Sequence, residues 1–243
     1  QKPVSNTWLK EIRDIYAAFA VYEQAGGAEQ ASFDVATGGA ISRSQRIVAW
    51  LEKQGLLPKT GALLDIGCGN GAFMRAYGGT NSVWRMTGLE LDARNKVCVE
   101  SIPGVTHLHV GPIESLDQKF DLIVMIHVLE HIPNPVVFLS SLLERLNPEG
   151  RLLIQVPDLS ASPFDLLIAD HCSHFSAAAL DRVVRSAGYK VWQIDATCVA
   201  KELTLLAEPA GTEVPTGKPM SVSSDDDARS AARHAEWLHQ VLR

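Results

Sequence analysis

Apolar positions follow helical spacing in the first part of the chain, up to residue 58. The first predicted helical face holds Leu9, Ile12, Ile15, Tyr16 and Phe19. A Gly- and Ala-rich break over 25–40 follows, and a second helix is predicted over 42–54, with Gly55 as its stop. We therefore expect residues 1–58 to form an N-terminal helical cover on the rest of the chain.

Between residues 59 and 208, short apolar runs alternate with helical patterns. The runs predict seven strands, over 62–67, 83–92, 105–110, 120–126, 151–156, 189–195 and 200–208. The runs 120–126 and 151–156 are almost continuously apolar, which is typical of central parallel strands covered on both faces. Alternating strands and helices predict an α/β fold with a doubly wound, seven-strand, mostly parallel sheet. The short link before the last strand predicts that this strand is antiparallel.

Two predicted helices in this part have clear ends. Asn134 is a candidate cap and Pro135 suits the first turn of a helix that runs to residue 146. Ser176 is the candidate cap of a second helix, and Gly188 is its stop.

Residues 209–224 are rich in Pro, Gly and Ser and are predicted to be a linker. A C-terminal helix is predicted over 225–243, because it starts with acidic residues and continues with basic ones. We expect it to dock back on the sheet or to begin a domain outside this chain. The first residue is Gln, so the chain is expected to be a piece of a longer protein.

Composition excludes several classes of protein. The formal net charge is −6, and an acidic surface disfavours nucleic-acid partners, which require clustered Lys and Arg. No apolar run approaches the roughly 20 residues that span a bilayer, and no signal peptide is visible. The cysteines are scattered, at Cys68, Cys98, Cys172 and Cys198, and we interpret them as reduced thiols of a cytoplasmic protein.

The stretch "LLDIGCGNGAF" (63–73) is the most informative, because a strand ends in three closely spaced glycines where a helix begins. Such a loop brings backbone N–H groups close to a ligand at the carboxyl end of a strand. A dinucleotide fingerprint requires G-x-G-x-x-G, whereas the spacing here is G-x-G-x-G. Glu90 ends the next predicted strand, where a carboxylate can accept ribose hydroxyls. A glycine turn with a purely structural role is the alternative.

The pattern acidic–Ile–Gly–Cys–Gly–x–Gly, with Asp65 as its acid, resembles the first motif of class I S-adenosylmethionine-dependent methyltransferases. The segment "FDLIVMIHVLEHIPNP" and the sequence that follows it to "QVPD" are similar to a branch of that family with an "LEH" signature. Ubiquinone-type O-methyltransferases, sugar C-methyltransferases and small-RNA 3′-end methyltransferases belong to this branch. The resemblance covers residues 59–208 and implies a Rossmann-like fold with S-adenosyl-L-methionine as cofactor.

The resemblance also implies a set of cofactor-binding residues: Asp65, Gly67, Cys68, Gly69, Gly71, Glu90, Leu91, Ile113, Glu114 and His127. The glycine loop and Asp65 would shape the methionine end, and Glu90 would hold the ribose with Leu91 beside the adenine. The family often has an Asp that accepts the adenine amino group. This chain has Pro112 there, so Ile113 would pack on the ring and Glu114 would replace the acid.

Four histidines are candidate catalytic residues: His127, His131, His171 and His174. Methyl transfer to a hydroxyl or a carbon acid requires a base, and histidine suits this role near neutral pH. A second interpretation is a metal site formed by His127, Glu130, His131 and His171, since the small-RNA and ubiquinone-type enzymes hold a divalent ion with an acid-x-x-Glu-His pattern and a later His. The third interpretation is structural, with these side chains bonded to backbone groups.

We therefore predict a methyltransferase that acts on a small-molecule acceptor, such as a sugar, a nucleotide-linked sugar or another metabolite. The oligomeric state stays open. Trp8, Tyr16, Tyr22 and Phe33 are candidates for a lid over the acceptor or for simple core packing. The alternatives are an RNA 3′-end methyltransferase with a metal-assisted site, and a non-catalytic binding module built on the same fold. An NAD-linked oxidoreductase is disfavoured by the glycine spacing.

Overall fold

The computed structural model describes residues 4–18, 29, 31–34, 38–80 and 83–211, and, near the C-terminus, 229, 232–234, 236–237 and 239–240. The strands are β1 (Ala31–Asp34), β2 (Gly39–Ser42), β3 (Thr60–Ile66), β4 (Val83–Glu90), β5 (Val105–Val110), β6 (Phe120–Ile126), β7 (Leu146–Pro157), β8 (Tyr189–Asp195) and β9 (Glu202–Pro209). The α-helices are α1 (Asn6–Ala18), α2 (Arg43–Gln54), α3 (Ala72–Gly78), α4 (Lys96–Glu100), α5 (Pro135–Leu142) and α6 (Ala177–Ser186). Short 3-10 turns are η2 (Ile113–Ser115), η3 (Leu129–His131), η4 (Leu143–Arg145) and η5 (Pro163–Leu167).

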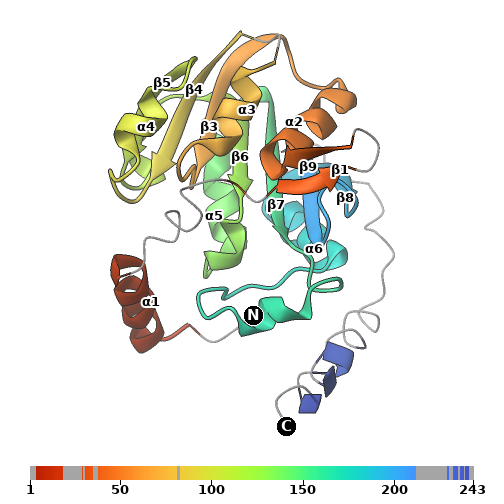
Figure 1. Ribbon diagram of the computed structural model, residues 1–243. Helices are drawn as coiled ribbons and strands as arrows, with labels where there is room; N and C mark the ends of the chain where they lie inside the picture. Colours follow the sequence, from red (N-terminus) through yellow and green to blue (C-terminus); the bar gives the residue numbers. More distant parts are fainter. Residues whose placement is uncertain are drawn as a thin grey trace.

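A seven-stranded sheet in the order β5-β4-β3-β6-β7-β9-β8 forms the centre of the fold (Figure 1). Strands β3 to β7 pair in parallel, and β9 pairs antiparallel with both of its neighbours. The predicted fold class is therefore confirmed, including the antiparallel last strand. The chain order reverses between β3 and β6, so the carboxyl ends of these two strands mark the edge where ligands bind in open α/β sheets.

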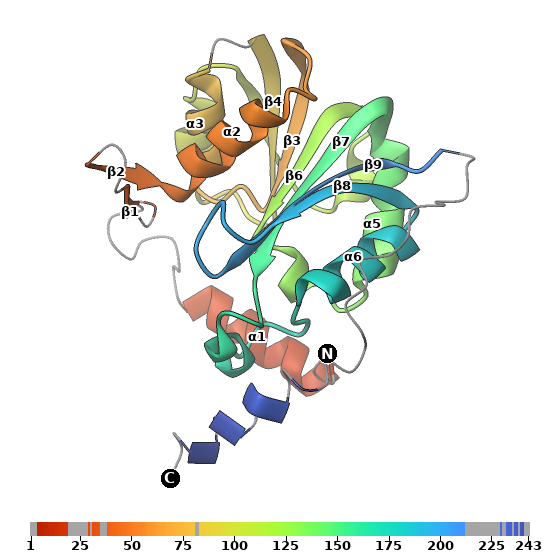
Figure 2. The ribbon, with the colours of Figure 1, turned by 90° about the vertical axis from the view of Figure 1, so that its right-hand side faces the viewer.

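Both faces of the sheet are covered, as the almost continuous apolar strands predict (Figure 2). Neighbouring residues such as Leu63 and Leu64 point into different core clusters. Helices α2, α3 and α4 cover one face, and α5 and α6 cover the other. This packing fixes the strands as a rigid frame, and the loops at their carboxyl ends are positioned by it.

Local helix signals agree with the structure in most places. Ser42 and Gln45 form a reciprocal capping box at the start of α2, and Gly55 ends it with φ 63°. Ser176 accepts from the backbone N–H of Ala179 at the start of α6. The prediction that Asn134 caps α5 was wrong in detail, because its side chain makes no capping hydrogen bond although it precedes Pro135.

The N-terminal segment differs from an all-helical cover. The predicted break over 25–40 contains part of a two-stranded hairpin, β1 and β2, whose strands are too short to show a pattern in the sequence. Helix α2 packs with Ile47 and Leu51 in the core beside α3, so it is a structural part of the sheet domain. Tyr22 lies outside the described residues.

Helix α1 and the C-terminal helix both contact the segment around η5. The indole N–H of Trp8 donates to the carbonyl of Ala169, at 3.0 Å. The described residues of the C-terminal segment are helical, and Trp237 lies edge-on to Phe164 with ring centroids 4.8 Å apart. The C-terminal helix thus contacts the η5 turn, while residues 212–228 of the predicted linker and helix start lie outside the described residues. Within the described residues, no helix combines the length and the apolar content that crossing a bilayer requires.

Candidate active site

The glycine loop after β3 has a backbone that only glycine adopts easily. Gly67, Gly69 and Gly71 all have positive φ, at 66°, 55° and 82°, and α3 begins at the next residue. The N–H of Gly67 donates to the carbonyl of Leu89, at 2.8 Å. A Cβ atom on Gly67 would lie 2.6 Å from Cγ2 of Val128, so the loop also packs closely on the residues that follow β6.

Glu90, the last residue of β4, faces this loop. Its Oε1 accepts from the N–H of Gly69 at 2.7 Å, and its Oε2 accepts from the N–H of Leu91 at 3.2 Å. Burial raises the pKa of Glu90, although these two hydrogen bonds act against the increase. An ionised carboxylate has about four lone-pair sites, so Glu90 retains acceptor capacity for a ligand.

Asp65 lies inside β3 and is only 2% exposed. Its Oδ2 has no hydrogen-bond partner in the described part of the chain. Burial raises its pKa well above the usual range, and the charges of Glu90 and Glu29 add to the increase. A buried carboxyl group beside a second acid is stabilised by a cationic ligand. S-adenosylmethionine carries a sulfonium and an ammonium group, so these residues fit the implied cofactor.

The other predicted cofactor-binding residues differ in how exposed their side chains are. Cys68 is buried, and burial raises the pKa of its thiol, so it stays neutral. Leu91 is 86% exposed directly beside Glu90, which leaves its side chain free to cover a ligand. Ile113 is buried in the core and Glu114 is exposed on the same 3-10 turn. Their roles toward the adenine stay predictions.

A second group of polar side chains lies at the same edge of the sheet, beyond β6. His127 follows β6 with φ 54°, an uncommon value for a residue with a side chain, and its backbone N–H donates to Gln155 at 3.0 Å. Its Nδ1 lies 3.1 Å from Oε1 of Glu130, and its Nε2 lies 3.1 Å from Oε1 of Glu202. Since β9 runs antiparallel, its first residue, Glu202, pairs with the last residue of β7 at this edge. Arg43 lies 3.1 Å from the same Glu202 carboxylate.

The two carboxylates determine the charge of His127. Burial opposes the imidazolium form, but contacts with Glu130 and Glu202 outweigh burial and raise the pKa of His127 to about 9. His127 therefore carries a positive charge at neutral pH in this structure. A protonated imidazole is a proton donor and has no free lone pair with which to act as a base.

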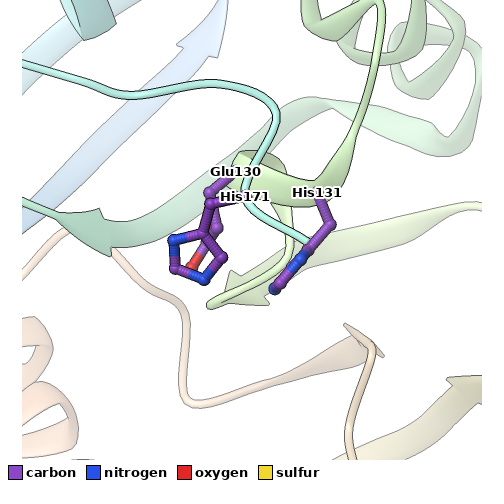
Figure 3. A group of neighbouring side chains, drawn as sticks. All are labelled: Glu130, His131 and His171. Carbon is purple, nitrogen blue, oxygen red and sulfur yellow. The ribbon is translucent and has the colours of Figure 1, made fainter. Parts of the chain in front are cut away.

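Glu130, His131 and His171 come together next to this ion pair (Figure 3). Their candidate ligand atoms all lie within 4.8 Å of one another. Glu130 is 0% exposed, and neither of its carboxylate oxygens has a hydrogen-bond partner among the described residues. Its backbone carbonyl accepts from the N–H groups of Cys172 and Ser173, at 2.9 and 3.0 Å, which fixes the His171 loop to η3.

Two acids that the sequence did not single out hold the histidines from the other side. Asp165 lies 2.6 Å from Nδ1 of His171 and 2.5 Å from Nδ1 of His174. Burial acts against its charge, but the two histidines outweigh burial and lower the pKa of Asp165 to about 2. Asp170 lies 3.2 Å from Nδ1 of His131. The only signal available in the sequence was the presence of both acids in the same segment as His171 and His174.

All four candidate histidines thus lie in one connected cluster. Glu130 contacts His127, the rings of His131 and His171 meet edge-on with centroids 4.7 Å apart, and Asp165 joins His171 to His174. Three members of the alternative metal set are close enough to share an ion, and His127 contacts the shared acid. Sequence reasoning missed Arg43 and Glu202, because they reach the site from α2 and from the start of β9.

A family model described as "Methyltransferase domain" matches residues 40–194. A ubiquinone biosynthesis O-methyltransferase from Glaesserella parasuis is 28% identical over 118 residues, which cover 44% of this chain and 49% of that protein. An uncharacterized 37.1 kDa protein in transposon TN4556 of Streptomyces fradiae is 26% identical over 188 residues, covering 74% of this chain and 49% of that protein. The chain thus spans about half the length of these curated relatives.

Among solved structures, the chain is similar to the 1,6-didemethyltoxoflavin-N1-methyltransferase of Burkholderia thailandensis, solved with 1,6-didemethyltoxoflavin and S-adenosylhomocysteine. The TM-score is 0.62 at 18% identity, over 86% of this chain and 92% of that one. At this identity the likeness shows a shared fold.

Proposed function

The chain belongs to the family of methyltransferase domains, class I, whose cofactor is S-adenosylmethionine, and we propose that it methylates a hydroxyl group of a small molecule. The observation that carries this proposal is the contact between two dissimilar loops. Val128, next to His127, packs against Gly67, so the glycine loop and the cluster of histidines and acids occupy neighbouring strand ends. A methyl donor on the first and an acceptor beside the second would be close together.

On the donor side, bound S-adenosylmethionine supplies the methyl group from its sulfonium. Glu90 would accept the ribose hydroxyls with the lone pairs that Gly69 and Leu91 leave free. The buried carboxyl of Asp65 would stabilise the positive charge of the methionine end. The glycines adopt positive φ angles, which residues with a Cβ rarely adopt, so they maintain the turn that would bring backbone N–H groups to the cofactor.

On the acceptor side, an alcohol or phenol has to lose a proton as the new bond forms. His127 already holds two protons, so we assign the base to His171. Its Nδ1 is bonded to Asp165, which leaves Nε2 as the atom that takes the proton. The ring of His131 lies edge-on to that of His171, and His174 shares the Asp165 carboxylate with it. The Arg43–Glu202 pair fixes the imidazolium of His127 at the edge of the site.

Calorimetry with S-adenosylmethionine, S-adenosylhomocysteine and NAD tests the donor half. We expect both sulfur ligands to bind and NAD not to bind. Transfer of labelled methyl to a panel of phenols, sugars, nucleotide-linked sugars and RNA oligonucleotides then tests the acceptor half. Tight NAD binding without binding of either sulfur ligand would overturn the proposal, and cofactor binding without transfer to any acceptor would favour a binding module.

A divalent metal ion at Glu130, His131 and His171 is a second candidate feature of the same site. The observation that favours it is the buried carboxylate of Glu130, which accepts no hydrogen bond among the described residues, although His127 lies 3.1 Å away, and which lies beside the imidazoles of His131 and His171. A donor set of nitrogen and carboxylate oxygen suits zinc, iron or manganese, and a bound ion would act as a Lewis acid on the acceptor oxygen. Full activity after chelation, in protein that contains no metal by elemental analysis, would rule this feature out.

An RNA 3′-end acceptor is the related alternative. The net charge of −6 argues against it, since phosphate backbones require clustered basic side chains. The RNA oligonucleotides in the acceptor panel distinguish it from the small-molecule proposal.

We also propose that the part of residues 1–58 ahead of α2 contributes a cover on the acceptor side, and that 209–224 link the sheet domain to the helix of 225–243. The hydrogen bond from Trp8 to Ala169 supports the first part, because Ala169 lies two residues before His171. The packing of Trp237 on Phe164 brings the C-terminal helix to the same segment.

A further inference from the structure

We propose that Asp165 is a positioning residue that fixes the same ring tautomer in His171 and His174, with the proton on Nδ1 and the lone pair on Nε2. The inference rests on the proposed function, in which Nε2 of His171 takes the acceptor proton. Asp165 itself contacts neither cofactor nor acceptor in this scheme and acts through the two imidazoles.

The geometry divides the carboxylate between the two rings. Oδ1 of Asp165 lies 2.6 Å from Nδ1 of His171, and Oδ2 lies 2.5 Å from Nδ1 of His174. Asp165 is 2% exposed, so water does not compete for these oxygens. With an imidazole nitrogen against each of its oxygens, the carboxyl is held in its ionised form, and an ionised carboxylate only accepts hydrogen bonds. Both Nδ1 atoms must therefore carry a proton.

The consequence differs for the two rings. In the neutral state, His171 keeps a lone pair on Nε2, and the residue belongs to the group with Glu130 and His131 whose candidate ligand atoms lie within 4.8 Å of one another. The Nε2 of His174 is buried and has no hydrogen-bond partner in the described part of the chain. One acid thus prepares two proton-accepting or metal-binding nitrogens, as acids behind ligand and catalytic histidines do in general.

The segment that carries Asp165 is fixed at both ends, so the carboxylate does not have to be ordered by a ligand. The N–H of Ser162 donates to the carbonyl of Asp158 at 2.8 Å, and the N–H of Asp165 donates to the carbonyl of Ser162 at 3.1 Å. At the other end, Cys172 and Ser173 donate to Glu130. Preorganisation of this kind is what a positioning residue requires.

The variant Asp165→Asn gives an unusually specific test. A side-chain amide offers an acceptor oxygen on one side and an N–H donor on the other. It therefore matches one Nδ1–H group but meets the second Nδ1 with a donor, and that ring has to move its proton to Nε2. Asp181→Asn is the matched control, because Asp181 is also 2% exposed and pairs with Arg185 instead of a histidine.

Long-range ¹H–¹⁵N spectra of the full chain without ligand, in an alkaline pH series, report the tautomer of each ring. Signals are assigned with His171→Gln and His174→Gln. We expect the Nδ1–H tautomer for both residues in the wild type and in Asp181→Asn, and an Nε2–H tautomer for one of them in Asp165→Asn. An Nε2–H tautomer of either residue in the wild type, or unchanged tautomers in Asp165→Asn, would overturn the inference.

If Asp165→Asn does not fold, the wild-type spectrum still decides, because the inference requires Nδ1–H in both rings. The proposed function fails separately, through the absence of S-adenosylhomocysteine binding in the wild type. In folded Asp165→Asn we expect the dissociation constant of S-adenosylhomocysteine to stay within about twofold of the wild-type value, since Asp165 is not part of the glycine loop.

Discussion

The donor and acceptor halves of the site lie at neighbouring strand ends, yet they are built in opposite ways. The donor half uses backbone N–H groups, three glycines and two acids, nearly all from the consecutive segments β3–α3 and β4. The acceptor half uses side chains that come from α2, η3, the η5 loop and β9. The first half depends on local backbone shape, and the second depends on the whole topology.

This difference teaches where each half is sensitive. A backbone loop loses function when its conformation is blocked or its acid is removed, and the effect stays within that loop. A charge network is more strongly coupled, because removal of one partner leaves another buried group unpaired. Mutations in the acceptor half should therefore change rate and stability more than mutations in the donor half.

The largest expected effect comes from His171→Gln. Loss of a general base typically costs about 10²–10⁴-fold in kcat, and we expect a similar cost if His171 instead binds a catalytic metal ion. We expect this loss with a dissociation constant for S-adenosylhomocysteine close to that of the wild type. Rates of labelled methyl transfer and calorimetry measure the two quantities.

The control for this variant is His107→Gln, a histidine on the outer strand β5. It should leave both quantities unchanged. Equal loss of rate in the two variants, or a loss of cofactor binding in His171→Gln, would remove the distinction between the halves.

The next effect concerns stability against pH. The pKa of His127 is about 9 in the folded chain and about 6.5 when unfolded, so its ion pairs contribute fully below pH 6.5 and are lost as pH rises through 9. At about 1.4 kcal/mol for each pKa unit, the rise from 6.5 to about 9 corresponds to roughly 3–4 kcal/mol at most. The free energy of unfolding should therefore fall across this window in denaturant titrations.

The variant His127→Asn isolates that contribution. Asn tolerates the positive φ of this position and carries no charge, so the backbone is conserved while the ion pairs with Glu130 and Glu202 are lost. We expect the variant to be less stable near neutrality and to show a much flatter pH dependence. An equally steep decline in wild type and variant would mean that other groups cause it.

The contrast between local patterns and long-range contacts also explains which parts of the structure could be predicted from the sequence. The strands 105–110, 120–126 and 189–195 match the structure residue for residue, since each carries a continuous or alternating apolar pattern in the sequence. Strand β7 begins at Leu146 and not at the predicted residue 151. The prediction was wrong because the Pro and Gly of "NPEG" usually mark a turn, whereas this strand accommodates both, with a register shift against β6. The hairpin of β1 and β2 was missed because four-residue strands leave no period.

In the site, the donor half was predictable because Gly67, Gly69, Gly71 and Glu90 follow directly from strand ends. The histidines of the acceptor half were also found, but their partners were not. Glu202 and Arg43 are 159 positions apart in the sequence and meet only because β9 runs antiparallel beside β7. The role of Asp165 depends on how the η5 loop folds back, which no local pattern determines.

A smaller effect is expected in the donor half. Glu90→Ala should weaken S-adenosylhomocysteine binding by about 1–3 kcal/mol, the usual cost of losing hydrogen bonds to a charged group. Calorimetry measures this change, and Glu144→Ala on the surface turn η4 is the control that should leave the affinity unchanged. Affinity that is the same in Glu90→Ala as in the wild type would mean that Glu90 does not hold the ribose.

The smallest effect should come from Trp8→Phe, which tests whether helix α1 belongs to the acceptor half. The substitution conserves an aromatic ring but removes the N–H that bonds to Ala169, a partly exposed contact whose loss costs about 0.5–1 kcal/mol. Because Ala169 lies on the loop of His171, we expect the KM for the acceptor to rise about two- to fivefold while the affinity for S-adenosylhomocysteine stays the same. A change in cofactor affinity with an unchanged acceptor KM would place α1 with the donor half instead. The split between the two constants is therefore more informative than the size of either, because it shows which half of the site the N-terminal segment serves.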